Sequence, residues 1–305
     1  MARIRFAVGS FLFIALFASG SMAQQRTFVS GVGNDGNPCS RTAPCRTISQ
    51  ALMGTSAGGE VIVLDSAGYG PVTITQAVSI IAPPGVYAGI SVFSGNGVTV
   101  NAGPTDTVIL RGLTINNQGS LGHGVVCNGA SSLRVESCAV SGFPFGFGVN
   151  FLSSGSLEVK DSILRGNNFG IAVLGAGGSA LVENVRLEAN ADGLDVEGGA
   201  RATVRNSLAS GNGDGFFVES IDGAGAAELN IENCVVTGSD TGVFATRTSN
   251  GGSVTIRVSN STVTNNRVGL TTSGTGSVVV LSRANNTVEG NMTDKAGNVA
   301  TYTAK

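Results

Sequence analysis

Acidic and aromatic residues recur beside a series of glycines in the second half of this 305-residue chain. Asp192 and Asp214 each stand immediately before a glycine, and Asp195 and Phe217 each stand two residues after one. Two carboxyl groups that share a site can act as general acid and general base, and exposed aromatic rings usually mark a contact surface. The pattern indicates Asp192 and Asp214 as candidate catalytic residues, and as candidate substrate-binding residues Asp195, Phe217, Glu219 and Phe244.

These residues belong to a repeat whose copies are 22 to 27 residues long. Each copy reads roughly Val-x-Asn-x-x-hydrophobic-x-x-Asn-x-x-Gly-hydrophobic-x-hydrophobic. Its first anchor falls at Gly112, Ser137, Asp161, Asn184, Asn206, Asn233, Asn260 and Asn285, and its second at Gly124, Gly148, Gly170, Gly193, Gly215, Gly242 and Gly269. A repeat of this length in a glycine-rich chain with short apolar runs is typical of a solenoid, in which each copy forms one coil.

Alternation within each copy predicts which side chains point inward. One apolar stack should contain Val135, Val159, Val182, Val204, Ile231 and Val258, and a second Val125, Val149, Ile171, Leu194, Phe216, Val243 and Leu270. The anchor asparagines should form an amide ladder at a bend, because Asn tolerates a left-handed backbone and can bond to the next coil.

The residue before each second-anchor glycine should form a column along the solenoid. This column runs His123, Phe147, Phe169, Asp192, Asp214, Thr241 and Val268. Asp192 and Asp214 would then lie on adjacent coils, about 5 Å apart at the backbone. The residues two positions after each glycine should form an outward column that contains Asp195, Phe217 and Phe244.

Residues 1–23 are typical of a cleaved export signal. Arg3 and Arg5 precede an apolar stretch from Phe6 to Ala18, and Ser21-Met22-Ala23 matches a small-x-small cleavage site. The apolar stretch is shorter than the roughly 20 residues that cross a bilayer, and no later run approaches that length. We expect a secreted or periplasmic protein with no membrane span after the signal is removed.

The charge pattern argues against a nucleic-acid partner. Charged residues form only 12% of the chain, and 18 basic residues are scattered among 20 acidic ones. Binding to a duplex requires clustered Lys and Arg that displace counterions from the phosphates. We therefore expect no nucleic acid among the partners.

Five cysteines in an exported protein suggest disulfides. Cys39 and Cys45 lie six residues apart in a loop, so we expect a local bridge between them. Cys138 and Cys234 occupy the same place in coils four turns apart, too distant to bond to each other, and should be buried thiols. Cys127 has no obvious partner, and the odd number leaves at least one free thiol.

The mature chain, residues 24–305, is interpreted as one elongated domain. Residues 24–60 should form an N-terminal cap, with a short helix that begins after the plausible N-cap Thr47 and covers the open end of the solenoid. Residues 61–291 should form the coils, and residues 292–305 a short polar tail.

The repeat resembles that of right-handed parallel β-helix proteins of the pectate-lyase-like superfamily, over nearly the whole mature chain. The opening Thr27-Phe28-Val29-Ser30, the loop Gly33 to Pro38 and Arg46-Thr47-Ile48 are also similar to the N-terminal cap of exported members. The resemblance implies an all-β fold, a single-stranded right-handed parallel β-helix with a short N-terminal capping helix. Because the superfamily contains lyases, hydrolases, tailspikes and adhesins, it implies the fold more narrowly than the reaction.

Two segments are similar to the catalytic segments of polygalacturonases. Asn190-Ala191-Asp192-Gly193-Leu194 resembles their Asn-Thr-Asp-Gly-Ile, and Gly213-Asp214-Gly215 falls where they have Gly-Asp-Asp. The resemblance implies that Asp214 is the acid and Asp192 part of the base. The second Asp of the pair is Gly215 here, no Arg-x-Lys follows, and Gly122-His123-Gly124 lies upstream of its place in that family.

Three alternatives stay open for the acids. Asp-Gly at the entry to a strand is ordinary turn chemistry. A lyase would use Ca²⁺, for which Asp195, Glu197 and Glu219 could supply oxygen ligands, but no basic residue stands clearly beside them, so we expect no cofactor and no metal. The favoured function is binding, with or without cleavage, of a polysaccharide or cell-surface glycan. The rival is a non-enzymatic surface or matrix protein, an adhesin or structural solenoid.

Overall fold

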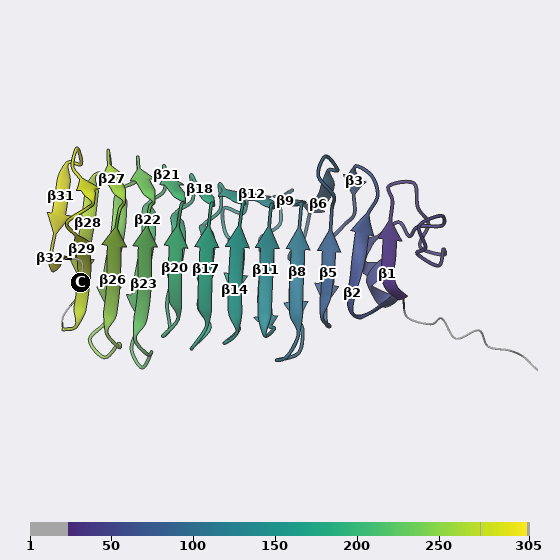
Figure 1. The fold of residues 1–305 in the computed structure, drawn as a ribbon, viewed down its shortest axis with the longest axis horizontal. Helices are drawn as coiled ribbons and strands as arrows, with labels where there is room; N and C mark the ends of the chain where they lie inside the picture. The colour runs from purple at the N-terminus through teal and green to yellow at the C-terminus, as the bar shows by residue number, and fades with distance from the viewer. Residues whose placement is uncertain (1–23, 275, 304–305) are drawn as a thin grey trace, which may run out of the picture.

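The computed structural model describes residues 24–274 and 276–303, so the predicted export signal lies outside the described residues. The chain winds into a stack of coils from β1 at one end to β31 and β32 at the other (Figure 1). Three parallel sheets run the length of the stack, and neighbours in each sheet come from successive coils. The predicted all-β parallel solenoid is confirmed.

Sheet A has twelve strands, of which β2, with nine residues, is the longest. In spatial order they are β1 (Gln24–Val29), β2 (Thr55–Val63), β5 (Val78–Ile81), β8 (Thr107–Arg111), β11 (Ser132–Glu136), β14 (Ser156–Lys160), β17 (Ser179–Glu183), β20 (Arg201–Arg205), β23 (Ala227–Glu232), β26 (Val254–Ser259), β29 (Val278–Arg283) and β32 (Val299–Tyr302).

Sheet B follows sheet A in each coil and consists of short strands. They are β3 (Ala67–Gly68), β6 (Ala88–Val92), β9 (Leu113–Asn117), β12 (Ala139–Ser141), β15 (Ile163–Arg165), β18 (Arg186–Glu188), β21 (Leu208–Ser210), β24 (Val235–Thr237), β27 (Thr262–Thr264) and β30 (Thr287–Val288).

Sheet C completes the coil and carries the candidate acids. Its strands are β4 (Val72–Ile74), β7 (Val98–Asn101), β10 (Val125–Gly129), β13 (Phe147–Phe151), β16 (Phe169–Val173), β19 (Asp192–Val196), β22 (Asp214–Ser220), β25 (Thr241–Arg247), β28 (Val268–Ser273) and β31 (Thr293–Ala296).

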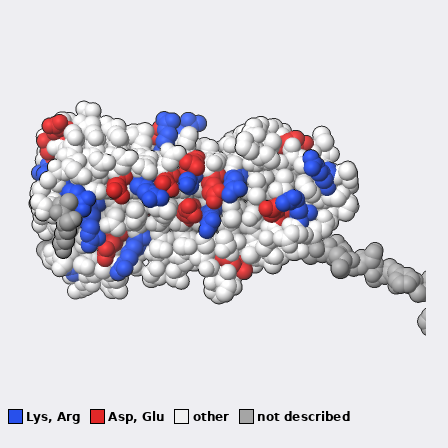
Figure 2. Space-filling view, in the orientation of Figure 1, with Lys and Arg blue, Asp and Glu red and all other residues white. Residues whose placement is uncertain are grey.

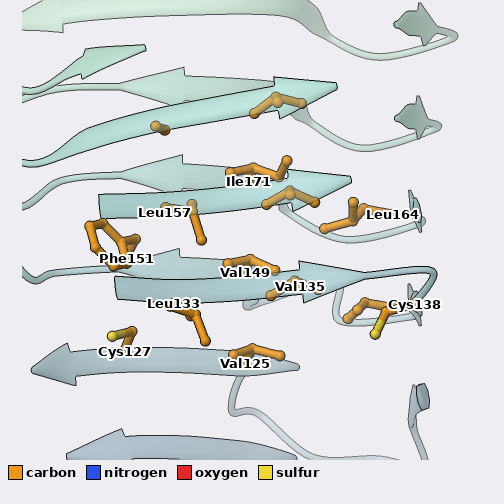
Figure 3. Close-up of a cluster of buried hydrophobic side chains, with 14 of the residues drawn as sticks. Val125, Cys127, Leu133, Val135, Cys138, Val149, Phe151, Leu157, Leu164 and Ile171 are labelled. Carbon is orange, nitrogen blue, oxygen red and sulfur yellow. The ribbon is translucent and has the colours of Figure 1, made fainter. Parts of the chain in front are cut away.

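Both predicted apolar stacks are confirmed. Val135, Val159 and Val182 pair in register across sheet A, and Val149, Ile171 and Leu194 do so across sheet C. All of these side chains are buried, and Figure 3 shows members of the two stacks facing each other inside the coil. Because each apolar residue packs on its counterpart in the next coil, the core is continuous along the solenoid.

The bend after each sheet A strand adopts the predicted left-handed backbone. The first anchors from Gly112 to Asn260 all have φ between 48° and 74°. The Nδ2 atom of Asn233 donates to Oδ1 of Asn206 at 2.6 Å, and that of Asn260 to Oδ1 of Asn233 at 3.3 Å. These bonds form the expected amide ladder on the surface, where the left-handed backbone favours Asn over most other residues.

A second asparagine ladder lies inside the solenoid at the entry to sheet C. Asn167, Asn190 and Asn212 are buried, and Nδ2 of Asn190 donates to Oδ1 of Asn212 at 3.1 Å and to the carbonyl of Leu164 at 3.2 Å. These amides satisfy backbone groups at a turn where the strand ladder is interrupted.

The glycine that follows this ladder is required by close approach between coils. A Cβ atom at Gly193 would lie 2.4 Å from the carbonyl oxygen of Gly215, and one at Gly215 would lie 2.5 Å from that of Gly242. Since neither approach can accommodate a side chain, glycine recurs here and lets the residue before it lie at the outer surface.

The N-terminal end contains one short helix, α1 (Ile48–Met53). The Thr47 hydroxyl accepts from the Gln50 N–H at 3.2 Å, which is the expected N-cap. The predicted Cys39–Cys45 disulfide is present beside it. β1 and β2 already belong to sheet A, so residues 24–60 are continuous with the coils.

The prediction of a polar tail after residue 291 is wrong for most of that segment. β31 pairs with β28, and β32 pairs with β29, so these residues add one more strand to sheets C and A. Their side chains are exposed or half-buried, and this last coil has lost the apolar alternation that identifies the others.

The three remaining cysteines are buried free thiols. Figure 3 shows Cys127 and Cys138 on opposite sides of the cross-section of the solenoid, and neither forms a disulfide. Burial raises the pKa of each of the three thiols to about 11. They act as small apolar residues, as predicted for Cys138 and Cys234.

Charged side chains are paired on the outer face of sheet A. Arg111 pairs with Glu136 across neighbouring strands at 2.6 Å, and Glu183 pairs with both Lys160 and Arg205. Figure 2 shows positive and negative side chains next to each other along the face that this view presents.

In the described ranges, no helix has the length and apolar character needed to cross a membrane.

Candidate functional site

The two candidate catalytic residues are neighbours on adjacent strands. Asp192 on β19 and Asp214 on β22 are direct register partners, which confirms the predicted column through Phe169, Asp192, Asp214 and Thr241. Both are half-buried at the start of their strands, and the spacing of paired strands puts their backbones about 5 Å apart. The two carboxyl groups are therefore close enough to influence each other's protonation.

Asp195 is more enclosed than the sequence indicated. Leu194 and Val196 point into the core, so Asp195 is on the outer side of β19 as expected, but only 1% of its surface is exposed. Its partners on the neighbouring strands are Ala172 and Phe217. The expected exposed ligand contact is thus a buried carboxyl group below the surface of sheet C.

Burial has a large effect on the protonation of Asp195. Loss of hydration, followed by the charge and hydrogen bond of Glu197, raises its pKa to about 9. Asp192 and Glu219 raise it further. The oxygen Oδ1 has no hydrogen-bond partner, as is also the case for Oδ1 of Asn150 in the same column. Asp195 is therefore a protonated acid at neutral pH.

The surrounding acids are shifted in the same direction. Burial and the charge of Asp214 raise the pKa of Asp192 to about 6. Burial raises the pKa of Asp214, opposed by a hydrogen bond from Thr241 and by the charge of Arg267. The pKa of Glu219 is raised by burial and by Glu197. Asp192 thus combines a raised pKa with partial exposure, as a proton donor near neutral pH requires.

The acids on the outer face of sheet C lack cationic partners. Among the described residues, each ion pair uses a carboxylate from sheet A, from β18 or from Asp240 in the turn before β25. Arg267 pairs with Asp240 and lies close enough to Asp214 to lower its pKa. The face carries five acids without an ion pair, namely Asp192, Asp195, Glu197, Asp214 and Glu219.

Aromatic rings adjoin the acids on both sides. Phe217 and Phe244 are half-buried, and their ring centroids lie 5.3 Å apart. On the other side the rings of Phe147 and Phe169 stack at 4.7 Å, and Phe169 is the register partner of Asp192. Phe147 and Phe169 lie in the predicted acid column but were not predicted to be site residues. Their position before successive glycines is the sequence signal that identifies them.

His123 lies at the far end of the aromatic column. Its ring contacts Phe147 edge to face at 4.9 Å, and its Nδ1 accepts the Phe147 backbone N–H at 3.2 Å. Burial lowers its pKa. It stands three strands from Asp192, so it does not join the acids.

Two connected loops follow the longest strands of sheet C. β22 and β25 each have seven residues, and the loops after them are joined through Asp222, which accepts from the Thr248 hydroxyl and from the Asn250 N–H. These bonds hold together the two loops at the end of the strands that carry Glu219 and Phe244.

The acids that could supply oxygen ligands to Ca²⁺ in a lyase, Asp195, Glu197 and Glu219, do not form a preorganised metal site. In residues 24–274 and 276–303, no group of three or more His, Cys, Asp or Glu side chains is arranged to hold a metal ion. Asp195 is also protonated, and a protonated carboxyl group is a poor ligand for Ca²⁺.

Known structures share this fold at low sequence identity. The chain is similar to the pectate lyase Pel9A with a TM-score of 0.63 and 18% identity, and the match covers 92% of this chain and 78% of that protein. It is also similar to the enzymatically active domain of tailspike protein 2 of bacteriophage CBA120, with a TM-score of 0.58 and 11% identity, over 83% of this chain and 43% of that one. A search of curated protein sequences finds no match.

The sequence itself identifies the family. Residues 88–257, more than half of the chain, match the family described as "Right handed beta helix region". The match includes the strands that carry the acids and Phe217. The chain therefore belongs to the right-handed β-helix family.

Proposed function

We propose that this protein binds a polysaccharide along the outer face of sheet C. The observation that carries the proposal is a row of stacked rings and unpaired acids on successive strands, Phe147, Phe169, Asp192 and Asp214, beside a second column in which Phe217 is followed by Phe244. Sugar rings present flat apolar faces to aromatic side chains and hydroxyl groups to carboxylates. Both kinds of contact are available here.

The direction of the columns suits an elongated ligand. The acid and aromatic columns run along the axis of the solenoid, because each coil contributes one residue to each column. A chain of sugars that lies along this axis meets a new side chain about every 4.8 Å. A pectate lyase and an enzymatically active tailspike domain share the fold, which is consistent with a polysaccharide ligand.

Hydrolysis of the bound glycan is a second proposal, favoured by the different environments of the acids. Asp192 is the better proton donor, because the Thr241 hydrogen bond and Arg267 favour the charged form of Asp214. This assignment reverses the roles implied by the polygalacturonase resemblance.

In the proposed step, Asp192 gives its proton to the glycosidic oxygen as the bond to the anomeric carbon breaks. Asp214 takes a proton from water, whose oxygen forms the new bond to that carbon. Exchange of protons with solvent then restores both acids.

Two structural roles accompany this function as proposals. Residues 1–23 direct export, so the protein acts outside the cytoplasm. Helix α1 caps the open end of the solenoid, supported by its contacts with β1, β2 and β4 and by the burial of Ile48, Ala51 and Leu52. A cap is needed there because an open end exposes apolar core and unpaired strand edges.

A glycan array tests the binding proposal. We expect the protein to bind at least one class of oligosaccharide, and the double variant Phe217→Ala/Phe244→Ala to lose about tenfold or more in affinity. Phe93→Ala is the control, because Phe93 is 72% exposed and follows a strand of sheet B. Equal losses in the double variant and in the control would place the ligand elsewhere, and no binding to any glycan would refute the proposal.

Release of reducing sugar tests hydrolysis separately. We expect turnover of the glycan found on the array, and loss of that turnover at saturating glycan in Asp192→Asn and in Asp214→Asn. Binding without turnover in the parent protein would leave a glycan-binding solenoid and exclude the hydrolase.

A further inference from the structure

We propose that the glycan bound by sheet C carries free amino groups, so that it is a cationic polymer and not a polyuronate. This inference rests on the proposed function and adds the class of substrate to it. It is carried by the charge of the face and by two buried acceptor atoms.

The first observation is a contrast between two faces of the same solenoid. On sheet A, the carboxylates of Glu136, Glu158 and Glu183 pair with cations on neighbouring strands. On sheet C, β19 and β22 carry four acids and Glu197 directly follows β19, and none of the five takes part in an ion pair among the described residues. Like charges on adjacent strands destabilise a sheet unless a partner neutralises them. A cationic ligand supplies that partner.

The second observation is a shortage of hydrogen-bond donors in the same column. Oδ1 of Asp195 and Oδ1 of Asn150 are buried without a hydrogen-bond partner, and the residues that carry them are 1% and 6% exposed. Because the Asp195 proton is used in the hydrogen bond with Glu197, both Oδ1 atoms are acceptors, so the ligand that satisfies this face must bring donors. An ammonium group has three N–H donors and no acceptor.

The positions of the acids fit such a group. Asp192 begins β19, Asp195 lies on the outer side of that strand, and Glu197 follows its last residue; Asp195 is the most buried of the three. An ammonium group docked on this strand would meet the accessible carboxyl groups of Asp192 or Glu197, which flank the buried Asp195 along the chain. Glu219 on the neighbouring strand closes the same space, since its charge also reaches Asp195.

A polyuronate would meet unfavourable charge on this face. Its carboxylates would lie beside those of the protein, and like-charge contacts reduce affinity strongly. Arg247, at the end of β25, is bonded to the loop carbonyls of Ser249 and Gly251. Lys295 lies on β31, three strands from β22.

Binding of a cation should also release protons. The charged groups that act on Asp195 are Asp192 on its own strand, Glu197 directly after that strand and Glu219 on β22, while its register partners on β16 and β22 are Ala172 and Phe217. A positive ligand charge favours the ionised form of every one of these acids. Heat measured at pH 7 in buffers of different ionisation enthalpy should therefore show net proton release on binding.

The test uses three oligosaccharide probes of equal length in titration calorimetry. They are β-1,4-linked glucosamine oligomers, their fully N-acetylated counterparts and galacturonate oligomers. At pH 6 and low salt we expect the amino oligomer to bind at least tenfold more tightly than the acetylated one, and the galacturonate to bind most weakly. Raising the salt to 0.5 M should remove most of this preference.

Matched variants locate the effect. Asp192→Asn/Asp214→Asn should abolish the preference for the amino oligomer. Glu158→Gln/Glu289→Gln removes the same charge from sheet A and from the turn after β30, and should leave the preference intact. If both double variants lost the preference, the amino oligomer would be attracted by the net charge of the protein and not by the sheet C face, and the inference would be overturned.

The outcomes separate this inference from the proposed function. Equal binding of amino and acetylated oligomers, or tighter binding of galacturonate, overturns the cationic class but leaves glycan binding in place. Absence of binding to all three probes and to the whole glycan array removes both.

Discussion

Asp195 and Phe217 are register partners across the β19–β22 pair, so an aromatic ring lies beside a buried carboxyl group on the outer side of sheet C. The ring and the small neighbour Ala172 leave little room for water at this position. Burial without hydration disfavours a carboxylate, which explains why the site contains an acid that keeps its proton at neutral pH.

The first prediction concerns stability against pH. The folded-state pKa of Asp195, about 9, lies above the value of about 3.9 in an unfolded chain. The folded protein therefore binds more protons between these values, and the free energy of unfolding falls as pH rises through this window. Asp195→Asn imitates the protonated acid and does not titrate. Its free energy of unfolding should therefore fall less steeply with pH than that of the parent, by up to about 1.4 kcal/mol per pH unit.

Denaturant unfolding of the parent and of Asp195→Asn at pH 4, 6 and 8 checks this prediction. The free energy of unfolding of the variant, relative to that of the parent, should increase at each step. Glu289→Gln, an exposed acid in the turn after β30, serves as the control and should follow the parent. If the parent instead gained stability relative to Asp195→Asn between pH 4 and pH 8, the raised pKa of Asp195 would be contradicted.

The second prediction concerns the ring beside that acid. Phe217→Ala should admit water to Asp195 and lower its pKa toward the normal range, because the burial that raises it is reduced. The carboxyl carbon shift of Asp195 in an NMR titration reports the value directly. Phe93→Ala should leave it unchanged, whereas an unaltered titration in Phe217→Ala would show that the ring has no part in the shift.

The third prediction separates the two asparagine ladders. Asn190→Ala removes the partners of the Asn167 N–H and of the Leu164 carbonyl inside the solenoid, and should destabilise the protein by about 2 to 4 kcal/mol. Asn233→Gly in the surface ladder keeps the left-handed backbone at φ 53°, and should cost about 0.5 kcal/mol. Chemical denaturation compares them, and equal costs would show that the inner amides are not required.

The fourth prediction concerns the Cys39–Cys45 bridge. Closing a loop this short contributes about 2 kcal/mol by chain entropy. Cys39→Ser/Cys45→Ser should therefore lose about that amount, with faster amide exchange in β1 and α1 and unchanged exchange in β22 and β25. Faster exchange throughout the coils would instead indicate that the N-terminal end controls the whole solenoid.

The coil architecture could be predicted from sequence because its determinants are local and repeated. Alternation around Val159 and Ile171 identifies the inward positions. From Asp161 to Asn260, each first anchor stands nine residues before a second-anchor glycine, and this constant distance predicts the register. The same register predicts Asp192 beside Asp214, as the structure confirms. The last coil was missed because residues 293–302 lack that apolar alternation.

The environment of the acids could not be predicted in the same way. Whether Asp195 is exposed depends on the sizes of Ala172 and Phe217, side chains from two other coils, and on the residues that flank it along β19. The stack of Phe147 on Phe169 also depends on ring orientation, which the spacing does not reveal. The register of the strands follows from the repeat, whereas the burial of a residue depends on the side chains that surround it.

The most direct test of the account is a crystal structure of the protein soaked with the oligosaccharide that binds best on the array. We predict density for a glycan along the outer face of sheet C, in contact with Phe217 and Phe244 and within hydrogen-bond distance of Asp192 or Glu197. Density on sheet A or sheet B, with the sheet C face empty, would contradict it.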